Sequence, residues 1–251
     1  MATTVRRAGL ACGYTLVELL VTLAVLSLLA ALLFPALARS RAAAKRVQCL
    51  SQLRQLGLAG QLYWDDHGGR SFPYRGGATN GGDIYWFGWL ARGAEGERAF
   101  DRRQGALEGY LGGEGVEVCP TLAYGMKDFK LKARGAAYGY GYNLNLASKA
   151  NAPGPGIFDL PHPSGTAFLA DAAQVNTFQP PASPDHPMLE EFYYLSRFES
   201  TAHFRHESRA CVVFVDGHAG AETWETGSVD QRMPQHHVAR LRTPVLTIEA
   251  D

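Results

Sequence analysis

An uninterrupted run of apolar residues near the N-terminus dominates the hydrophobic pattern of this chain. Between residues 14 and 36 the only side chain that carries a charge at neutral pH is Glu18. About 20 such residues, each rising about 1.5 Å along a helix, cross a bilayer core of about 30 Å. The pattern therefore predicts a transmembrane helix over residues 14–36.

The helical pattern continues beyond this run, but only one face of it is apolar. Residues 37–66 contain no proline and are rich in Ala, Leu, Arg and Gln, which favour helix. The apolar positions recur at steps of four and three residues: Cys49, Leu53, Leu56, Gly60 and Tyr63. Such a stripe predicts an amphipathic continuation that packs on a folded domain. Gly57 and Gly60 either weaken this helix or allow another backbone to approach it closely.

Beyond residue 67 the patterns are those of short strands and loops. Residues 138–143 alternate tyrosine with glycine, which predicts a strand whose tyrosines pack against the long helix and whose bare face has a neighbour. Residues 166–171 and 210–215 predict buried strands. Asp216-Gly217 predicts a two-residue hairpin turn into a return strand at residues 218–224.

These elements predict an α+β fold in which one long N-terminal helix packs on an antiparallel sheet with loop insertions. Residues 67–251 form the globular domain, and its tail at residues 244–248 either adds an edge strand or stays loose. The chain has 251 residues and a formal net charge of zero, which argues against nucleic acid as a partner. The sequence contains none of the common catalytic motifs, so we expect neither enzymatic activity nor a cofactor.

Glu18 is out of place inside an apolar span, because a carboxylate in hydrocarbon costs at least ~2.5 kcal/mol. A secretory signal peptide would be cut on the far side of the apolar run, near Ala31 or Ala38, and would leave Glu18 unexplained. A plain signal anchor has the same defect. Cleavage after Gly13 would instead create a new α-amino group, which could pair with Glu18 of a neighbouring copy.

The segment Gly-Tyr-Thr-Leu-Val-Glu at residues 13–18 resembles the leader and first helix of type IV pilins and pseudopilins. Pro35, near the end of the span, is similar to a proline common in these helices. The resemblance implies that a prepilin peptidase cuts after Gly13 and N-methylates Tyr14, and that Glu18 is the assembly carboxylate. Residues 1–13 would then be the prepilin leader.

The resemblance also implies a function and a location. We expect a structural subunit of a type IV pilus or a type II secretion pseudopilus-like filament, assembled through its N-terminal helix. Its partners would be its own copies, other pilin-like subunits, the prepilin peptidase, the inner-membrane assembly platform and membrane lipid. Arg6 and Arg7 keep the N-terminus cytoplasmic, so the chain would cross the inner membrane once, with its C-terminal domain in the periplasm or at the cell surface. The alternative is a membrane-anchored domain that binds a glycan or another ligand.

Loss of the leader would remove Cys12 and leave Cys49, Cys119 and Cys211, an odd number. In an oxidising compartment at most one internal disulfide can form. We expect it between Cys49 on the long helix and Cys119 in a loop. The alternative is three buried free thiols that act as small apolar residues.

A second resemblance lies near the C-terminus, where nine residues separate His206 from Asp216-Gly217. This spacing is similar to the C-terminal motif of a pilin-like subfamily. An extended strand would hold His206 and Asp216 about 20 Å apart, too far to share one metal ion, so no metal site is predicted from this pair.

Overall fold

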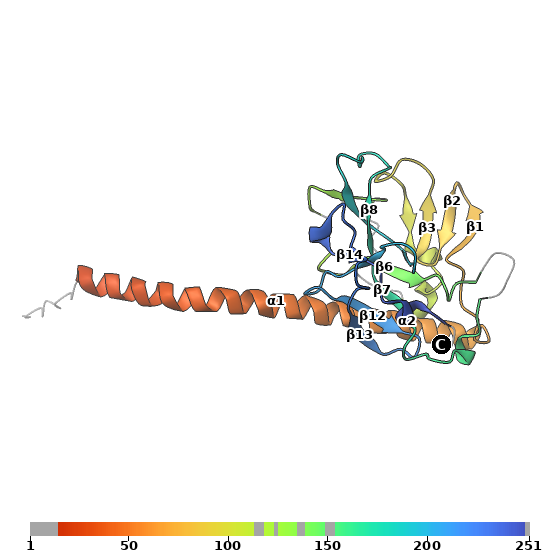
Figure 1. The fold of residues 1–251 in the computed structure, drawn as a ribbon, viewed down its shortest axis with the longest axis horizontal. Helices are drawn as coiled ribbons and strands as arrows, with labels where there is room; N and C mark the ends of the chain where they lie inside the picture. The colour runs from red at the N-terminus through yellow and green to blue at the C-terminus, as the bar shows by residue number, and fades with distance from the viewer. Residues whose placement is uncertain (1–14, 113–117, 123–124, 135–138, 149–153, 249–251) are drawn as a thin grey trace, which may run out of the picture. The chain divides into compact units, whose positions relative to one another are not determined.

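The computed structural model describes residues 15–112, 118–122, 125–134, 139–148 and 154–248 (Figure 1). The chain divides into two compact units, residues 1–43 and residues 44–251. One helix, α1 (Leu16–Asp66), contributes residues to both units. The α+β class with a long N-terminal helix is confirmed.

α1 is 51 residues long and contains Pro35. It includes an 18-residue stretch with a mean hydropathy of 2.6, of which no residue is buried, so it is long and apolar enough to cross a membrane. The helix ends at the predicted residue, Asp66. It stops there because Gly68 and Gly69 adopt left-handed φ angles of 61° and 75°, and the Gly69 N–H donates to the Trp64 carbonyl at 2.7 Å.

A five-stranded sheet with the order β10-β6-β7-β12-β13 lies at the centre of the second unit. Its strands are β6 (Tyr140–Asn143), β7 (Ala167–Asp171), β10 (Tyr194–Leu195), β12 (Ala210–Phe214) and β13 (Ala219–Glu222). The sheet is mixed, in contrast to the predicted antiparallel sheet, because β10 pairs with β6 in parallel. The other neighbouring pairs are antiparallel.

Three smaller sheets complete the second unit. The first is a four-stranded meander: β1 (Arg75–Thr79), β2 (Gly82–Tyr85), β3 (Gly88–Ala91) and β4 (Phe100–Asp101). The second has the order β5-β9-β8: β5 (Phe129–Lys130), β9 (Met188–Glu191) and β8 (Ala173–Asn176). The third pairs β11 (Ala202–His203) with β14 (Val238–Ala239). Within the described residues, four short 3₁₀ helices lie between strands: Arg102–Gln104, Glu108–Tyr110, Ile157–Asp159 and Pro234–His236.

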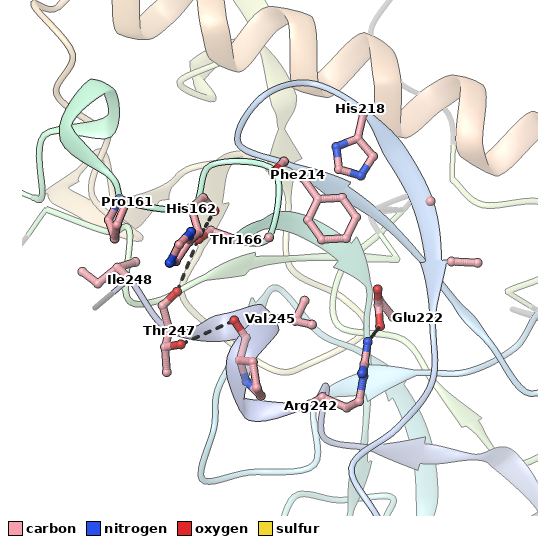
Figure 2. Close-up of a pocket in the computed structure, with 15 residues that line it drawn as sticks. Pro161, His162, Thr166, Phe214, His218, Glu222, Arg242, Val245, Thr247 and Ile248 are labelled. Atoms are coloured by element: carbon pink, nitrogen blue, oxygen red, sulfur yellow. Dashed lines mark hydrogen bonds and ion pairs between the residues drawn. The ribbon is translucent and has the colours of Figure 1, made fainter. Parts of the chain in front are cut away.

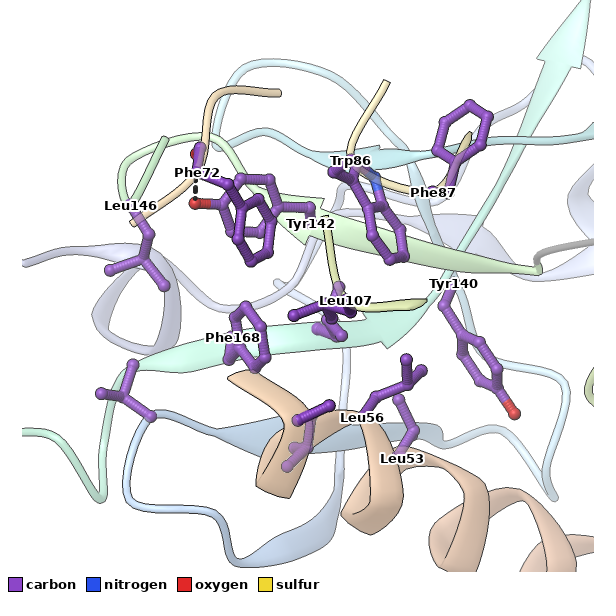
Figure 3. Close-up of a cluster of buried hydrophobic side chains, with 14 of the residues drawn as sticks. Leu53, Leu56, Phe72, Trp86, Phe87, Leu107, Tyr140, Tyr142, Leu146 and Phe168 are labelled. Atoms are coloured by element: carbon purple, nitrogen blue, oxygen red, sulfur yellow. Dashed lines mark hydrogen bonds between the residues drawn. The ribbon is translucent and has the colours of Figure 1, made fainter. Parts of the chain in front are cut away.

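β12 is buried on both faces, which explains its continuous apolar sequence. Cys211 and Val213 belong to the same core cluster as Leu53 and Leu56 of α1. Figure 3 shows these two leucines pointing from the helix toward the sheet, next to Phe168 of β7. The opposite face of β12 packs in a second cluster with Phe204, which precedes the strand, and with side chains of the C-terminal segment: Leu241, Val245 and Leu246.

The glycines of α1 allow close contact with the sheet. This agrees with the interpretation that they permit close approach. A Cβ atom at Gly60 would lie 2.4 Å from the ring of Phe168, and one at Gly57 would lie 2.6 Å from Val213. Gly141 on β6 is equally crowded, since its Cβ would lie 2.8 Å from Ala172. Tyr140 and Tyr142 are buried, as predicted for tyrosines that pack in the core, whereas Tyr138 lies outside the described residues.

The hairpin after β12 forms, but its loop has three residues instead of the predicted two. Phe214 pairs with His218, so Val215, Asp216 and Gly217 make the turn. Gly217 takes a left-handed φ of 88°, the position that glycine fills in three-residue loops. The tail also differs from the prediction: Thr243–Leu246 form a short helix, α2, because Val245 and Leu246 turn into the second core cluster.

Candidate functional site

Thr15 and Glu18 close the N-terminus of α1 through reciprocal hydrogen bonds. Oε2 of Glu18 accepts from the N–H and from the hydroxyl of Thr15, each at 2.8 Å, and the Glu18 N–H donates to Thr15 Oγ1 at 3.2 Å. This is a capping box, which the sequence analysis missed although the Thr-x-x-Glu spacing is its signature. No described residue donates to the other carboxylate oxygen, Oε1. Gly13 and Tyr14, the predicted processing residues, lie outside the described residues.

Large apolar side chains cover α1 on every side between residues 16 and 37. Their exposed fractions range from 41 % for Leu37 to 75 % for Leu16. An exposed apolar surface of this extent is unstable in water and marks a segment that contacts lipid or other helices. The geometry fits a membrane anchor.

Four side chains that commonly bind metals meet inside the second unit, and we call them the thiol–histidine cluster: Cys49, Cys119, Asp171 and His206. Each comes from a different segment: α1, the loop before β5, the end of β7 and the turn before β12. All four are at most 3 % exposed. One sulfur, nitrogen or oxygen atom of each lies within 4.8 Å of the corresponding atoms of the other three.

Hydrogen bonds and short contacts connect the members of this cluster. The Cys49 thiol donates to Asp171 Oδ1 at 3.2 Å, and Cys119 Sγ is hydrogen-bonded to His206 Nε2 at 3.2 Å. His206 Nε2 lies 3.5 Å from Asp171 Oδ2. The structure has Cys49 and Cys119 as free thiols, in contrast to the predicted disulfide. The third cysteine, Cys211, is also a buried free thiol.

The two thiols of the cluster are held in their neutral form. The hydrogen bond with Cys49 and burial both raise the pKa of Cys119. At Cys49 the contact with Cys119 lowers the pKa, but Cys211, burial and the Asp171 carboxylate together raise it by more. Neither thiol therefore ionises at neutral pH without a cation beside it.

Asp171 is fixed by partners outside the cluster. Arg205 Nη2 contacts Asp171 Oδ1 at 2.6 Å, and the backbone N–H of Cys211 donates to Oδ2 at 2.7 Å. The Arg205 side chain is 3 % exposed. The negative charge of Asp171 is thus neutralised by a buried guanidinium, which keeps its carboxylate oriented toward the sulfurs.

A tight turn places His206 in the cluster. His206 and Arg209 exchange two backbone hydrogen bonds of 3.0 Å, with Glu207 and Ser208 at the turn. Both turn residues have positive φ angles, 52° and 62°, the backbone of a type I′ turn. Sequence reasoning missed this turn, since neither residue is the usual Gly, Asn or Asp.

Both ends of the His206–Gly217 motif contact α1. His206 reaches Cys49 through the cluster, and Gly217 lies so near the helix that a Cβ atom there would be 2.7 Å from the Gln61 amide. The motif therefore holds the β12 hairpin along the second half of α1. Asp216 does not join the cluster; its carboxylate instead lies 2.6 Å from Nδ1 of His218.

His218 lies at an open cleft of about 540 Å³ between the β12–β13 hairpin and α2 (Figure 2). Its ring stacks on Phe214 with centroids 4.3 Å apart. Across the cleft, Arg242 Nη2 contacts Glu222 Oε2 at 2.5 Å. The cleft thus offers aromatic rings and a charged pair, but the sequence analysis did not identify it.

Two family models match parts of the chain. Residues 10–34 match the model described as "Prokaryotic N-terminal methylation motif", and residues 38–94 match "Protein of unknown function (DUF1559)". No curated protein and no solved structure matched. The first match contains Gly13, Tyr14 and Glu18, and the second contains the end of α1 that packs in the core. The chain therefore carries a prepilin-type methylation motif, which indicates a pilin-like exported protein, and is similar to the DUF1559 family over residues 38–94.

Proposed function

We propose that this protein is a structural subunit of a type IV pilus or of a type II secretion pseudopilus-like filament, and not an enzyme. In this proposal prepilin peptidase cuts after Gly13 and N-methylates Tyr14 at the inner membrane. The mature subunit crosses that membrane once and holds its C-terminal domain in the periplasm. The assembly platform then adds it to its own copies and to other pilin-like subunits.

The exposed apolar surface of α1 is the observation that supports this proposal most strongly. Between residues 16 and 37 every large apolar side chain is exposed, and the one carboxylate, Glu18, lies at the end of the span. In a lone helix lipid covers this apolar surface, and in a bundle of copies neighbouring helices cover it. The same segment can therefore serve the membrane-bound and the assembled state.

Glu18 gives the packing of copies a defined register. In the single chain Thr15 occupies only Oε2 of Glu18, so Oε1 can accept a hydrogen bond from a neighbour. The α-amino group created by cleavage after Gly13 is a suitable donor. In an apolar surrounding this charge pair forms only when both partners align, which favours one stagger between adjacent subunits.

Processing and assembly can be tested with one variant and one crosslinker. Gly13→Val should leave the full-length precursor in the membrane, because the peptidase site has no room for a side chain before the cut. Intact-mass analysis of the wild type should give a chain that begins at Tyr14, and crosslinking of membranes should give a ladder of oligomers. A mature chain beginning after Ala31 or Ala38 would contradict the proposal and favour an ordinary signal peptide.

The cleft at His218 favours a second candidate, a membrane-anchored domain that binds a glycan or another small ligand. Its volume falls within the usual range for ligand sites, and the stacked ring pair could contact a sugar face. An anchored receptor of this kind would be processed at the same site but would stay monomeric in the crosslinking experiment. Ladder formation thus separates the two candidates.

A further inference from the structure

We propose that the thiol–histidine cluster binds one zinc ion, which fastens α1 to the β-rich domain. The four ligands would be the two thiolates, Nε2 of the histidine and one carboxylate oxygen of the aspartate. The site is structural in kind, since all four positions are taken by protein and the surroundings exclude water. This inference does not depend on whether the protein forms filaments.

The spacing of the four groups fits tetrahedral zinc. Bonds of about 2.3 Å to sulfur and about 2.0–2.2 Å to nitrogen or oxygen place neighbouring ligand atoms about 3.4–3.8 Å apart. In the structure Cys119 Sγ lies 3.2 Å from His206 Nε2, Cys49 Sγ lies 3.2 Å from Asp171 Oδ1, and His206 Nε2 lies 3.5 Å from the other oxygen, Oδ2. With one atom taken from each residue, all four lie within 4.8 Å of one another. Side-chain shifts of at most about 1 Å bring the four atoms to the separations of a tetrahedral site.

The ligand types select the class of metal. Two sulfurs with one imidazole nitrogen and one carboxylate oxygen suit a borderline or soft ion such as Zn²⁺. Calcium and magnesium prefer oxygen ligands, so they do not suit this set. In the four-ligand tetrahedral arrangement, zinc is the common structural ion.

The charges balance both with and without the ion. Without it, two neutral thiols lie beside Asp171 and Arg205, whose charges cancel. Binding of Zn²⁺ releases the two thiol protons to solvent, and the added double positive charge is offset by the two thiolates. Arg205 and the N–H of Cys211 would then act as outer partners that orient the ligating carboxylate.

A disulfide between Cys49 and Cys119 is the competing occupant, because an exported protein lies in an oxidising compartment. It would use two of the four groups and would remove the thiol hydrogen bonds to Asp171 and His206. It would also give no reason for the turn at Glu207 and Ser208 that delivers the histidine. Zinc uses all four groups, and for this reason we favour it.

The test is the metal content of the full-length protein, purified in detergent without chelators and then dialysed with Zn²⁺. We expect about one zinc per chain, resistant to further dialysis against metal-free buffer. Cys49→Ala, Cys119→Ala and His206→Ala should each retain less than about a tenth of an equivalent. Val212→Ala is the control: it truncates an equally buried side chain of β12 that belongs to the second core cluster, and it should keep the zinc.

A second measurement covers the case in which the cluster variants fail to fold. Cobalt added to the metal-free wild type should give thiolate-to-cobalt charge-transfer bands and the intense visible bands of a tetrahedral site. The proposal fails if the wild type takes up neither zinc nor cobalt. It also fails if thiol titration in denaturant without reductant finds Cys49 and Cys119 oxidised, or if Val212→Ala loses zinc as fully as the cysteine variants.

Discussion

The two halves of α1 have the same secondary structure but are made for different surroundings. From residue 16 to residue 43 no described side chain is buried, and apolar residues cover all sides as far as residue 37. From residue 44 to residue 66 a single face is buried, with Cys49, Leu53 and Trp64 at most 1 % exposed. The first half requires an apolar partner from outside the chain, whereas the second has its partner in the domain that follows. One continuous helix can therefore join a membrane or a filament core to a folded domain.

The largest effect should come from Glu18, the one carboxylate in the first half. Glu18→Ala should be exported and cleaved but should not assemble, because the buried α-amino group of the neighbour loses its partner. Leaving such a charge unpaired costs about 3–5 kcal/mol, which is more than a hundredfold in association. Filament yield, measured by shearing or by crosslinking, is the readout.

Glu18→Gln is the matched variant that isolates the charge. Glutamine preserves the capping box with Thr15, because an amide oxygen also accepts the Thr15 N–H. We expect this variant to fail in assembly as Glu18→Ala does. If Glu18→Gln assembles as the wild type does, the residue acts as a helix cap and the proposed charge pair is wrong.

The next largest effect should come from a leucine in the second half. Leu53→Ala removes a fully buried side chain and should lower the free energy of unfolding of the domain by about 2–5 kcal/mol. Leu26→Ala is the control, since Leu26 is 61 % exposed and should leave domain unfolding unchanged. Denaturant unfolding of the full chain in detergent, followed by tryptophan fluorescence, measures both. Equal effects of the two substitutions would contradict the conclusion that only the second half of α1 packs in the core of the domain.

A smaller loss is expected where α1 approaches the sheet most closely. Gly60→Ala would place a Cβ atom 2.4 Å from the buried ring of Phe168, so one of the two must move. Overpacking costs about 1–3 kcal/mol, and the better helix propensity of alanine recovers up to about 1 kcal/mol. We expect a net loss of about 1 kcal/mol. The exposed control Ser51→Ala should be neutral or slightly stabilising. If Gly60→Ala raises the stability instead, the contact between α1 and Phe168 is not tight.

The smallest effect is a pH dependence in the β1–β4 meander, which contributes no strand to the five-stranded sheet. Arg92 and Arg75 lower the pKa of Asp83 to about 2, and their nitrogens lie 3.0 Å and 2.8 Å from its carboxylate. A lowered pKa means that this pairing stabilises the fold above the unfolded value of about 3.9 and is lost as the pH falls toward 2. The difference in unfolding free energy between wild type and Asp83→Asn should be constant near neutral pH and shrink below about pH 4. If the difference in unfolding free energy persists near pH 2, the effect of Asp83→Asn comes from altered packing and not from the lost ion pairs.

The sequence by itself determined the elements whose signals are local. The end of α1 at Asp66 and the strands β7 and β12 follow from the spacing of apolar residues and from turn residues at their ends. The processing motif is equally local, because a short run of residues next to an apolar segment defines it. These features need no knowledge of which segments meet in space.

Only the tertiary structure decided which distant residues meet. Cys49 and Asp171 are 122 residues apart in sequence and share a hydrogen bond, and His206 joins them through a turn that has no glycine signal. The parallel pairing of β10 and the helical tail at residues 243–246 were likewise set by contacts from other segments. Periodicity reports which face of an element is buried, but it does not report the order of strands or the loops that bring ligands together. For that reason the sequence predicted the fold class and the assembly segment, while the thiol–histidine cluster became visible only in the folded chain.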